Sequence, residues 1–301
     1  MMTDYINSAY SKLRFKYLAP ILSEMKRVNY AIIKGEVLSM YAYGRPGQRH
    51  SSDIDILIPY KSLSDVENIL MRNGFSKNFN AKNKRMEKMI VSHQAIPWKK
   101  EHSMFGPIII DINYDVFWGE YEGPRVDMVA FLSDSVEIEV YDIRVKALSP
   151  IKALIQLVLH HYKDMNSIFL LATRDSIRIE MFKDLYYLLK NNLDKIPLEK
   201  LYMLSDEYQI IPYVFYILYY TGQLFEDNAL KEYIEKFRTP KGESILDLYG
   251  LCEKEQREWK VDFNTRLVAN NLLQLIEKDL TDRDFKKIEI NKRIFMEEIN
   301  E

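Results

Sequence analysis

The sequence predicts an α+β protein in which a small mixed sheet flanked by helices is followed by an all-helical domain. In the first half, short apolar runs alternate with helical stretches. From residue 149 onward, apolar residues recur at helical spacing with few interruptions. The chain has 301 residues, of which 47% are hydrophobic and 29% charged, as expected for roughly two globular domains. We therefore expect one domain over residues 1–148 and a second over residues 149–301.

The first element is an amphipathic helix over residues 3–27. Apolar residues recur there at steps of three and four, which is the spacing of one helix face. This face consists of Ile6, Tyr10, Leu13, Tyr17, Leu18, Leu22 and Met25. Pro20 is expected either to kink the helix or to divide it in two.

A strand and a tight turn follow the first helix. Residues 28–34 end in an apolar run, and Gly35 then provides the turn into a short helix over residues 36–43. Residues 43–52 are rich in Gly, Pro, Arg and Ser, which predicts a loop.

The next strand carries two acids. Side chains alternate across a strand, so Asp53 and Asp55 share one side while Ile54 and Ile56 share the other. Adjacent carboxylates repel each other, and a strand that carries them requires a cation, a metal or exposure to solvent. A helix over residues 61–73 with Gly74 as its C-cap completes this part of the sheet domain.

The rest of the predicted sheet lies between residues 76 and 148. Residues 76–85 are polar and predict a loop, while residues 86–93 predict a strand. Residues 135–148 supply one or two further strands.

The strongest strand signal in this part is the run over residues 105–118. Alternation places Ile108 and Ile110 on one face. The other face carries Ile109, Asp111, Asn113 and Asp115. A third acid therefore stands at the end of an aliphatic run, with Asp115 as the alternative to Asp111.

The second half is predicted to be helical. Pro150 suits a first helical turn with Ser149 as N-cap, and further helices are expected over residues 177–192, 198–208 and 212–224. Residues 240–242 are expected to break the pattern before a charged helical remainder. His160 and His161 lie on an apolar helix face, where packed histidines are commoner than metal ligands.

Composition excludes several classes of protein. A net charge of −2 provides no global attraction to nucleic acid, although it leaves a local basic patch open. The single cysteine, Cys252, excludes an intrachain disulfide and a cysteine-rich metal site. The most apolar run, residues 210–220, is about half the length needed to span a membrane. We expect a cytoplasmic protein with no membrane association and no disulfide-linked partner.

The residues of the sheet domain point to metal-dependent phosphoryl transfer. A glycine turn, a loop with Arg45 and Arg49, the acids Asp53 and Asp55, and a third acid at Asp111 together suit two divalent cations. Carboxylate oxygens are preferred ligands of Mg²⁺, which shares its coordination shell with substrate phosphates. Two such ions can activate an attacking hydroxyl and stabilise a leaving pyrophosphate. A solvated surface role remains open for each of the arginines.

These motifs also carry a family resemblance. Lys34-Gly35 before a short helix, Arg49, the run Ser52-Asp53-Ile54-Asp55 and Gly74-Phe75 resemble the nucleotidyltransferase superfamily of polymerase-β-like and kanamycin nucleotidyltransferases, and within it an uncharacterised bacterial branch. The resemblance covers residues 32–118 and continues weakly into the helix after residue 148. Three features depart from the family pattern. Glu36 stands where the family usually has a small residue, Asn113 stands where it often has a histidine, and the spacing from Gly35 to Asp53 is longer than in compact members.

The resemblance implies an enzyme that moves a nucleoside monophosphate from an NTP such as ATP to an acceptor hydroxyl, with release of pyrophosphate. Two Mg²⁺ ions, or Mn²⁺ in their place, would be the cofactors. Asp53, Asp55 and Asp111 would be the catalytic metal ligands. Lys34, Gly35, Arg49 and Ser52 would bind the nucleotide phosphates.

The resemblance leaves the acceptor open: a small molecule, a protein or an RNA. The helical domain would bind it. Two alternatives share the fold: a catalytically inactive nucleotide-binding or regulatory module, and a toxin-like or tRNA-modifying transferase.

Overall fold

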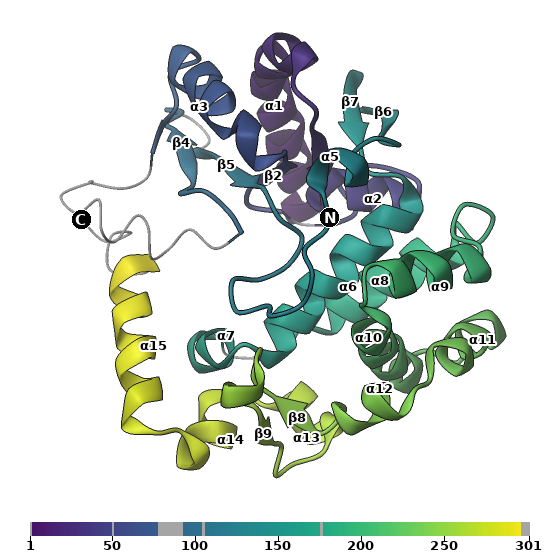
Figure 1. Ribbon diagram of the computed structural model, residues 1–301. Helices are drawn as coiled ribbons and strands as arrows, with labels where there is room; N and C mark the ends of the chain where they lie inside the picture. Colours follow the sequence, from purple (N-terminus) through teal and green to yellow (C-terminus); the bar gives the residue numbers. More distant parts are fainter. Residues whose placement is uncertain (1, 50, 78–92, 104–105, 175–176, 296–301) are drawn as a thin grey trace. The chain divides into compact units, whose positions relative to one another are not determined.

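The computed structural model describes residues 2–49, 51–77, 93–103, 106–174 and 177–295. The chain forms two compact units. Unit 1 comprises Met1–Gly119, Arg125–Leu154 and Tyr187–Ile196, and unit 2 comprises Glu120–Pro124, Ile155–Tyr186 and Pro197–Glu301. The predicted fold class is confirmed, because unit 1 contains a mixed sheet with helices packed on it and unit 2 is mainly helical (Figure 1).

The sheet of unit 1 has seven strands in the order β3-β4-β5-β2-β1-β7-β6. Its strands are β1 (Ala31–Ile33), β2 (Ile54–Leu57), β3 (Ser76–Lys77), β4 (Trp98–Lys100), β5 (Ile108–Asn113), β6 (Val136–Val140) and β7 (Ile143–Ala147). Strand β2 runs parallel to β5 and antiparallel to β1, while β1 runs parallel to β7. The sheet is therefore mixed, and β2 lies between the strand that leads into the glycine turn and the strand that carries Asp111.

Helices of unit 1 pack on the aliphatic face of this sheet. The helices of the unit include α1 (Met2–Glu24), α2 (Gly35–Tyr43), α3 (Leu63–Arg72) and α5 (Met128–Phe131). Phe15 and Leu18 of α1 share one buried cluster with Val66 of α3 and with Ile56 and Ile110 of the strands. Figure 1 shows α1 and α3 beside β2 and β5. Burial of these apolar side chains holds the strands in the register that the site requires.

Helix α1 differs from its predicted packing in one respect. It is continuous through Pro20, and a short 3₁₀ turn, Met25–Arg27, follows it. Its buried face is rotated from the predicted one and consists of Ser11, Arg14, Phe15, Leu18, Ile21, Leu22 and Met25. Leu13 and Tyr17 are only half-buried. A serine and an arginine thus lie where apolar residues were expected.

The edge strands of the sheet differ in part from the predicted ones. Strand β4 was not predicted, and β3 lies at the start of the stretch expected to be a loop. The strand predicted over residues 86–93 falls outside the described residues except at His93. Strands β6 and β7 form a hairpin whose turn residues, Tyr141 and Asp142, have φ of 52° and 65°. Positive φ at both central residues matches the twist of a tight antiparallel hairpin.

The helices from residue 150 onward follow the predicted pattern closely. They are α6 (Pro150–Asn166), α7 (Ile168–Thr173), α8 (Ile179–Lys190), α9 (Leu198–Glu207), α10 (Ile211–Leu224), α11 (Asn228–Phe237), α12 (Pro240–Ser244), α13 (Phe263–Val268), α14 (Leu273–Ile276) and α15 (Asp282–Phe295). Pro240, expected to break the pattern, instead opens α12. A two-stranded pair, β8 (Leu248–Tyr249) with β9 (Arg257–Glu258), is the non-helical exception. Among the helices that the structure describes, none combines the length and apolarity of a membrane span.

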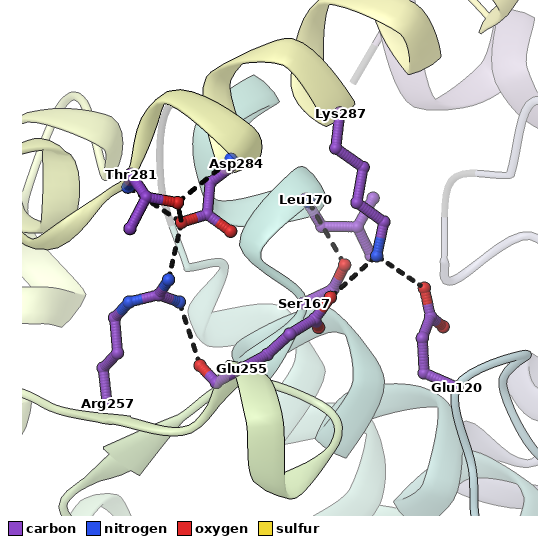
Figure 2. A network of polar contacts seen from close by, with 8 residues as sticks. All are labelled: Glu120, Ser167, Leu170, Glu255, Arg257, Thr281, Asp284 and Lys287. Atoms are coloured by element: carbon purple, nitrogen blue, oxygen red, sulfur yellow. Dashed lines mark hydrogen bonds and ion pairs between the residues drawn. The ribbon is translucent and has the colours of Figure 1, made fainter.

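A polar network holds α15 in unit 2 (Figure 2). Thr281 precedes the helix and Asp284 stands in its first turn, and each accepts a hydrogen bond from the other's backbone N–H, which is a capping box. Arg257 Nη2 donates to Asp284 Oδ2 at 2.6 Å. Lys287 Nζ lies 2.7 Å from Glu255 and 3.6 Å from Glu120. Side chains distant in sequence therefore fix the start of the last helix.

Replacing Arg257 by Met is expected to lower the free energy of unfolding by about 1–3 kcal/mol, because it removes a charged hydrogen bond to an acid that is only 12% exposed. The Lys287 side chain is 50% exposed, so replacing Lys287 by Met should change the free energy of unfolding by less than about 0.5 kcal/mol. Burial alone would raise the pKa of Asp284, but Thr281 and Arg257 hold it below its ordinary value. The Arg257 contribution should therefore fade as the pH falls through that lowered pKa. Urea unfolding of both variants at several pH values tests this, and equal losses in the two would contradict it.

Candidate functional site

The sheet places three aspartates on one face. Asp53 immediately precedes β2, Asp55 lies within it, and Asp55 is the direct register partner of Asp111 on the parallel strand β5. Register partners on parallel strands point to the same side of a sheet. Asp53 shares this side because it is two residues before Asp55. The structure thus brings together acids that are more than fifty residues apart in sequence.

Asp55 is the most fully contacted of the three acids. Its Oδ1 accepts hydrogen bonds from Lys34 Nζ at 3.1 Å and from Asn113 Nδ2 at 3.2 Å. Lys34 directly follows β1, whose last residue pairs with Asp55, and Asn113 lies on β5 two residues beyond Asp111. Both groups orient the Asp55 carboxylate, and the lysine offsets its charge.

Asp53 is oriented by Ser51. The Ser51 hydroxyl lies 3.2 Å from Asp53 Oδ1 and 2.9 Å from the Asp53 carbonyl oxygen. Ser51 is buried, whereas Ser52, the predicted phosphate-binding residue, is exposed. Arg49 is half-buried in the loop before Ser51. Arg45 is exposed and donates to Gln48 Oε1 at 2.9 Å.

Mutual repulsion and burial weaken the acidity of this cluster. Burial raises the pKa of Asp111 to about 7, and the charges of Asp55 and Asp53 add to the effect. Burial and the Asp55 carboxylate likewise raise the pKa of Asp53, while Lys34 and Ser51 oppose the increase. Oδ1 of Asp111 is buried and has no hydrogen-bond partner among the described residues. A divalent cation would relieve each of these costs, so the three acids fit a metal that prefers oxygen ligands.

Asp115, the alternative to Asp111 as third acid, is paired with an arginine. Asp115 Oδ2 accepts from Arg125 Nη1 at 2.6 Å, and its Oδ1 accepts the Phe117 N–H at 2.9 Å. These contacts account for both oxygens of Asp115. Asp111, not Asp115, is therefore the acid that completes the cluster on the sheet.

The turn between β1 and α2 is strained. Lys34 has φ of 54° and Gly35 has φ of 42°, and positive φ is unusual for a residue with a side chain. A Cβ on Gly35 would stand 3.3 Å from Ser51 Oγ. Gly35 begins α2, which lacks a side-chain N-cap bond. The first N–H groups of a helix have no intrahelical acceptors, and they favour an anion.

A small pocket lies at this turn. Its lining includes Arg14, Gly35, Ser51, Asp53 and Asp55. Glu36 also lines it, and its Oε2 accepts the Gly47 N–H at 2.6 Å. The glutamate found in place of a small residue thus fastens the following loop to the start of α2.

A second cluster of possible metal ligands lies in unit 2. Among the described residues, His160, His161 and Asp164 are the group whose ligand atoms all lie within 4.8 Å of one another. The three aspartates of the sheet, which belong to the same described part of the chain, do not form a group of that spacing, and Lys34 offsets the charge of Asp55 instead. Arg174 Nη1 donates to Asp164 Oδ2 at 2.7 Å, and although burial would raise the Asp164 pKa, this arginine holds it low. Because Arg174 already neutralises Asp164, we give this cluster no cofactor role.

The roles of two orienting residues and one cation of the pocket were missed by the sequence analysis. Strand alternation did place Asn113 on the face of Asp111, but no role was assigned to it. Ser51 could not be distinguished from Ser52, since both follow the same loop. Arg14 gave no signal, because an arginine in an amphipathic helix is expected on the solvent face.

Comparisons with known proteins give one family and several structures. A family model described as "Uncharacterised nucleotidyltransferase" matches residues 15–226. A solution structure of the antibiotic-resistance factor ANT(2'')-Ia is similar with a TM-score of 0.38 and 11% identity, covering 67% of this chain and 92% of that chain. A crystal structure of ANT(2'')-Ia with adenylyl-2''-tobramycin has a TM-score of 0.37 and 12% identity, and the match covers 63% of this chain and 92% of that chain. A crystal structure of a nucleotidyltransferase-like protein from Paracoccidioides brasiliensis has a TM-score of 0.30 and 14% identity, and the match covers 65% of this chain and 91% of that chain. A search of curated proteins finds no match.

Proposed function

Because the chain belongs to the uncharacterised nucleotidyltransferase family, we propose that it transfers a nucleoside monophosphate from an NTP to an acceptor hydroxyl and releases pyrophosphate. The observation that carries the proposal is the pairing of Asp55 with Asp111 in the register of β2 and β5, with Asp53 on the same face. Three acids at one point of a sheet are costly for the fold. A phosphoryl-transfer site that uses divalent cations gives them a role.

In the proposed mechanism, Asp53, Asp55 and Asp111 would hold two Mg²⁺ ions. Bound there, the ions would supply Lewis acidity for the acceptor hydroxyl and neutralise charge on the phosphates. Lys34 and Asn113 orient Asp55, and Ser51 orients Asp53. The N-terminus of α2 at Gly35 binds phosphate oxygens. Lys34 and Arg49 remain further candidates for phosphate binding.

The chemical step in this proposal needs one base. The acceptor oxygen attacks the α-phosphorus, and the bond between that phosphorus and the pyrophosphate oxygen breaks. Asp111, on the strand beside Asp55, accepts the hydroxyl proton. Pyrophosphate leaves with the electron pair of the broken bond. The remaining rate enhancement comes from positioning and electrostatics.

The test is incubation of the full chain with each α-labelled NTP, Mg²⁺ and a cell extract separated into RNA, protein and small-molecule fractions. Label should appear in one fraction, with an equal amount of pyrophosphate. Asp53→Asn should abolish both signals. Asp65→Asn, an exposed acid on α3, is the matched control and should change neither. Failure of every NTP and every fraction to yield pyrophosphate would refute transfer. Label in the RNA fraction would identify a tRNA-modifying type of enzyme.

One observation favours a nucleotide-binding module without catalysis. Lys34 already neutralises Asp55 at 3.1 Å and so competes with a cation for that carboxylate. Such a module would bind NTP in the presence of Mg²⁺ and release no pyrophosphate. The same incubation, combined with a measurement of NTP binding, separates the two functions.

Gly35→Ala is expected to weaken NTP binding about tenfold or more. The new methyl group would meet Ser51 Oγ and force a residue with φ of 42° away from its position at the start of α2. The matched control is Gly44→Ala at the other end of α2, where φ is 74° but no atom lies within 4 Å. Both variants should lose about 1 kcal/mol of stability. Equal NTP binding by the two variants, measured by calorimetry, would show that the turn does not contact the nucleotide.

A further inference from the structure

Arg14 is a cation on the buried face of α1. The side chain is 2% exposed and lies between Ser11, Phe15 and Leu18 on that face. Burial of a charged group is costly unless hydrogen bonds and opposite charges compensate it. The position of Arg14 therefore calls for a partner of its own.

Its hydrogen bonds to the other described residues use one of its three nitrogens. Arg14 Nη2 donates to Ser11 Oγ at 3.0 Å and to the carbonyl oxygen of Ser51. Nε and Nη1 are buried and have no hydrogen-bond partner among the described residues. Leaving donors of a buried charged group unsatisfied is unfavourable. The guanidinium is thus held in place at one nitrogen, and its other two nitrogens are buried without a hydrogen-bond partner among the described residues.

Arg14 is the cation in the lining of a small pocket that also contains the acids Glu36, Asp53 and Asp55. Arg14 lines the same pocket as Gly35, where α2 begins, and as Ser51 and Asp53. Glu36, one of these acids, accepts the Gly47 N–H at its Oε2. Glu36 and Asp53 attract the guanidinium electrostatically, but no salt bridge joins either of them to Arg14 among the described residues. The positive end of α2 and the guanidinium therefore act on one small space.

We propose that Arg14 binds the β- and γ-phosphates of the NTP, together with the first N–H groups of α2. This inference rests on the proposed function and adds to it a residue outside the sheet and its turns. A guanidinium presents parallel N–H donors that match two oxygens of a phosphate. Arg14 would hold the pyrophosphate part of the substrate while Asp53 and Asp55 act at the α-phosphate.

The experiment measures binding of tripolyphosphate and of the free nucleoside to the full chain in the presence of Mg²⁺, by calorimetry. Arg14→Met should weaken tripolyphosphate binding about 10- to 100-fold, the value of one or two charged hydrogen bonds, and change nucleoside binding less than about twofold. Arg14→Lys keeps the positive charge but removes the paired N–H donors of the guanidinium, and it should weaken tripolyphosphate binding about tenfold. The control is Arg72→Met, an exposed arginine paired with Glu24, which should alter neither affinity.

A purely structural role would give a different result. If Arg14 only balances Glu36 and Asp53, Arg14→Met loses thermal stability, and the protein that remains folded binds tripolyphosphate as the wild type does. Arg14→Lys decides the question if Arg14→Met does not fold, because unchanged tripolyphosphate binding in that variant overturns the inference. Binding that depends on Arg14 without any nucleotidyl transfer would refute the proposed function and leave this inference standing. Nucleotidyl transfer together with tripolyphosphate binding that does not depend on Arg14 would refute this inference and leave the proposed function standing.

Discussion

Asp53→Asn is expected to lower nucleotidyl transfer by about a thousandfold or more and to leave the fold intact, and Asp55→Asn should do the same. Asparagine keeps the size of the side chain and can still accept the hydrogen bond from Ser51 to Oδ1 at 3.2 Å. It removes the charge on which cation binding depends. Since burial and Asp55 raise the pKa of Asp53, loss of this charge also removes repulsion. The Asp53→Asn protein should therefore unfold no earlier than the wild type.

The measurements are steady-state pyrophosphate release, titration with Mg²⁺, and urea unfolding of each purified variant. Asp65→Asn on the surface of α3 is the control for the loss of one carboxylate. Turnover at the wild-type rate in the purified double variant Asp53→Asn/Asp55→Asn would show that these acids are not the metal ligands.

Asp111→Asn is expected to abolish transfer and at the same time to stabilise the protein at alkaline pH. The pKa of Asp111 is about 7 in the folded chain against an ordinary value of 3.8. Below the ordinary value, both the folded and the unfolded states hold the proton. Between the two values only the folded state holds it, so stability falls as the pH rises, and above pH 7 the loss is complete. The aspartate thus weakens the fold at the pH at which the proposed reaction would use its charge.

The asparagine side chain cannot ionise, so the Asp111→Asn variant should gain about 1–2 kcal/mol over the wild type at pH 8, allowing for solvent screening at a half-buried group. This corresponds to roughly 2–8 °C in melting temperature. At pH 4 the two proteins should be nearly equal. Asp115→Asn is the matched control with the opposite sign, because it breaks the 2.6 Å pair with Arg125 and should destabilise the protein. A gain for Asp111→Asn that did not grow between pH 4 and pH 7 would contradict the proposed cause.

The acid cluster shows how far local patterns extend. Alternation along β2 placed Asp53 with Asp55, and alternation along β5 selected Asp111 or Asp115. The pattern could not choose between these two, because the choice depends on register. The structure pairs Asp55 with Asp111 and gives Asp115 to Arg125. Register is set by packing between distant segments, which a single sequence does not display.

Helix α1 shows where such patterns fail. Apolar spacing predicted the helix and the burial of Leu18, Leu22 and Met25, but not the burial of Ser11 and Arg14 in place of Leu13 and Tyr17. Periodicity assumes that a charged residue faces water. Arg14 instead faces a pocket lined by acids, and no property of the helix alone reveals that. The short strand β4 was missed for a related reason, since a three-residue strand depends on its partner β5 and not on its own composition.

The parallel pairing of β2 with β5 has a consequence for when the proposed site forms during folding. Neighbouring parallel strands cannot be joined by a hairpin, so this contact closes a long loop and is slow to form. Until that loop closes, Asp55 and Asp111 are far apart, their repulsion is absent, and the nascent chain carries isolated acids that do not form a site. A chain in which β2 and β5 are not paired would therefore lack the proposed site.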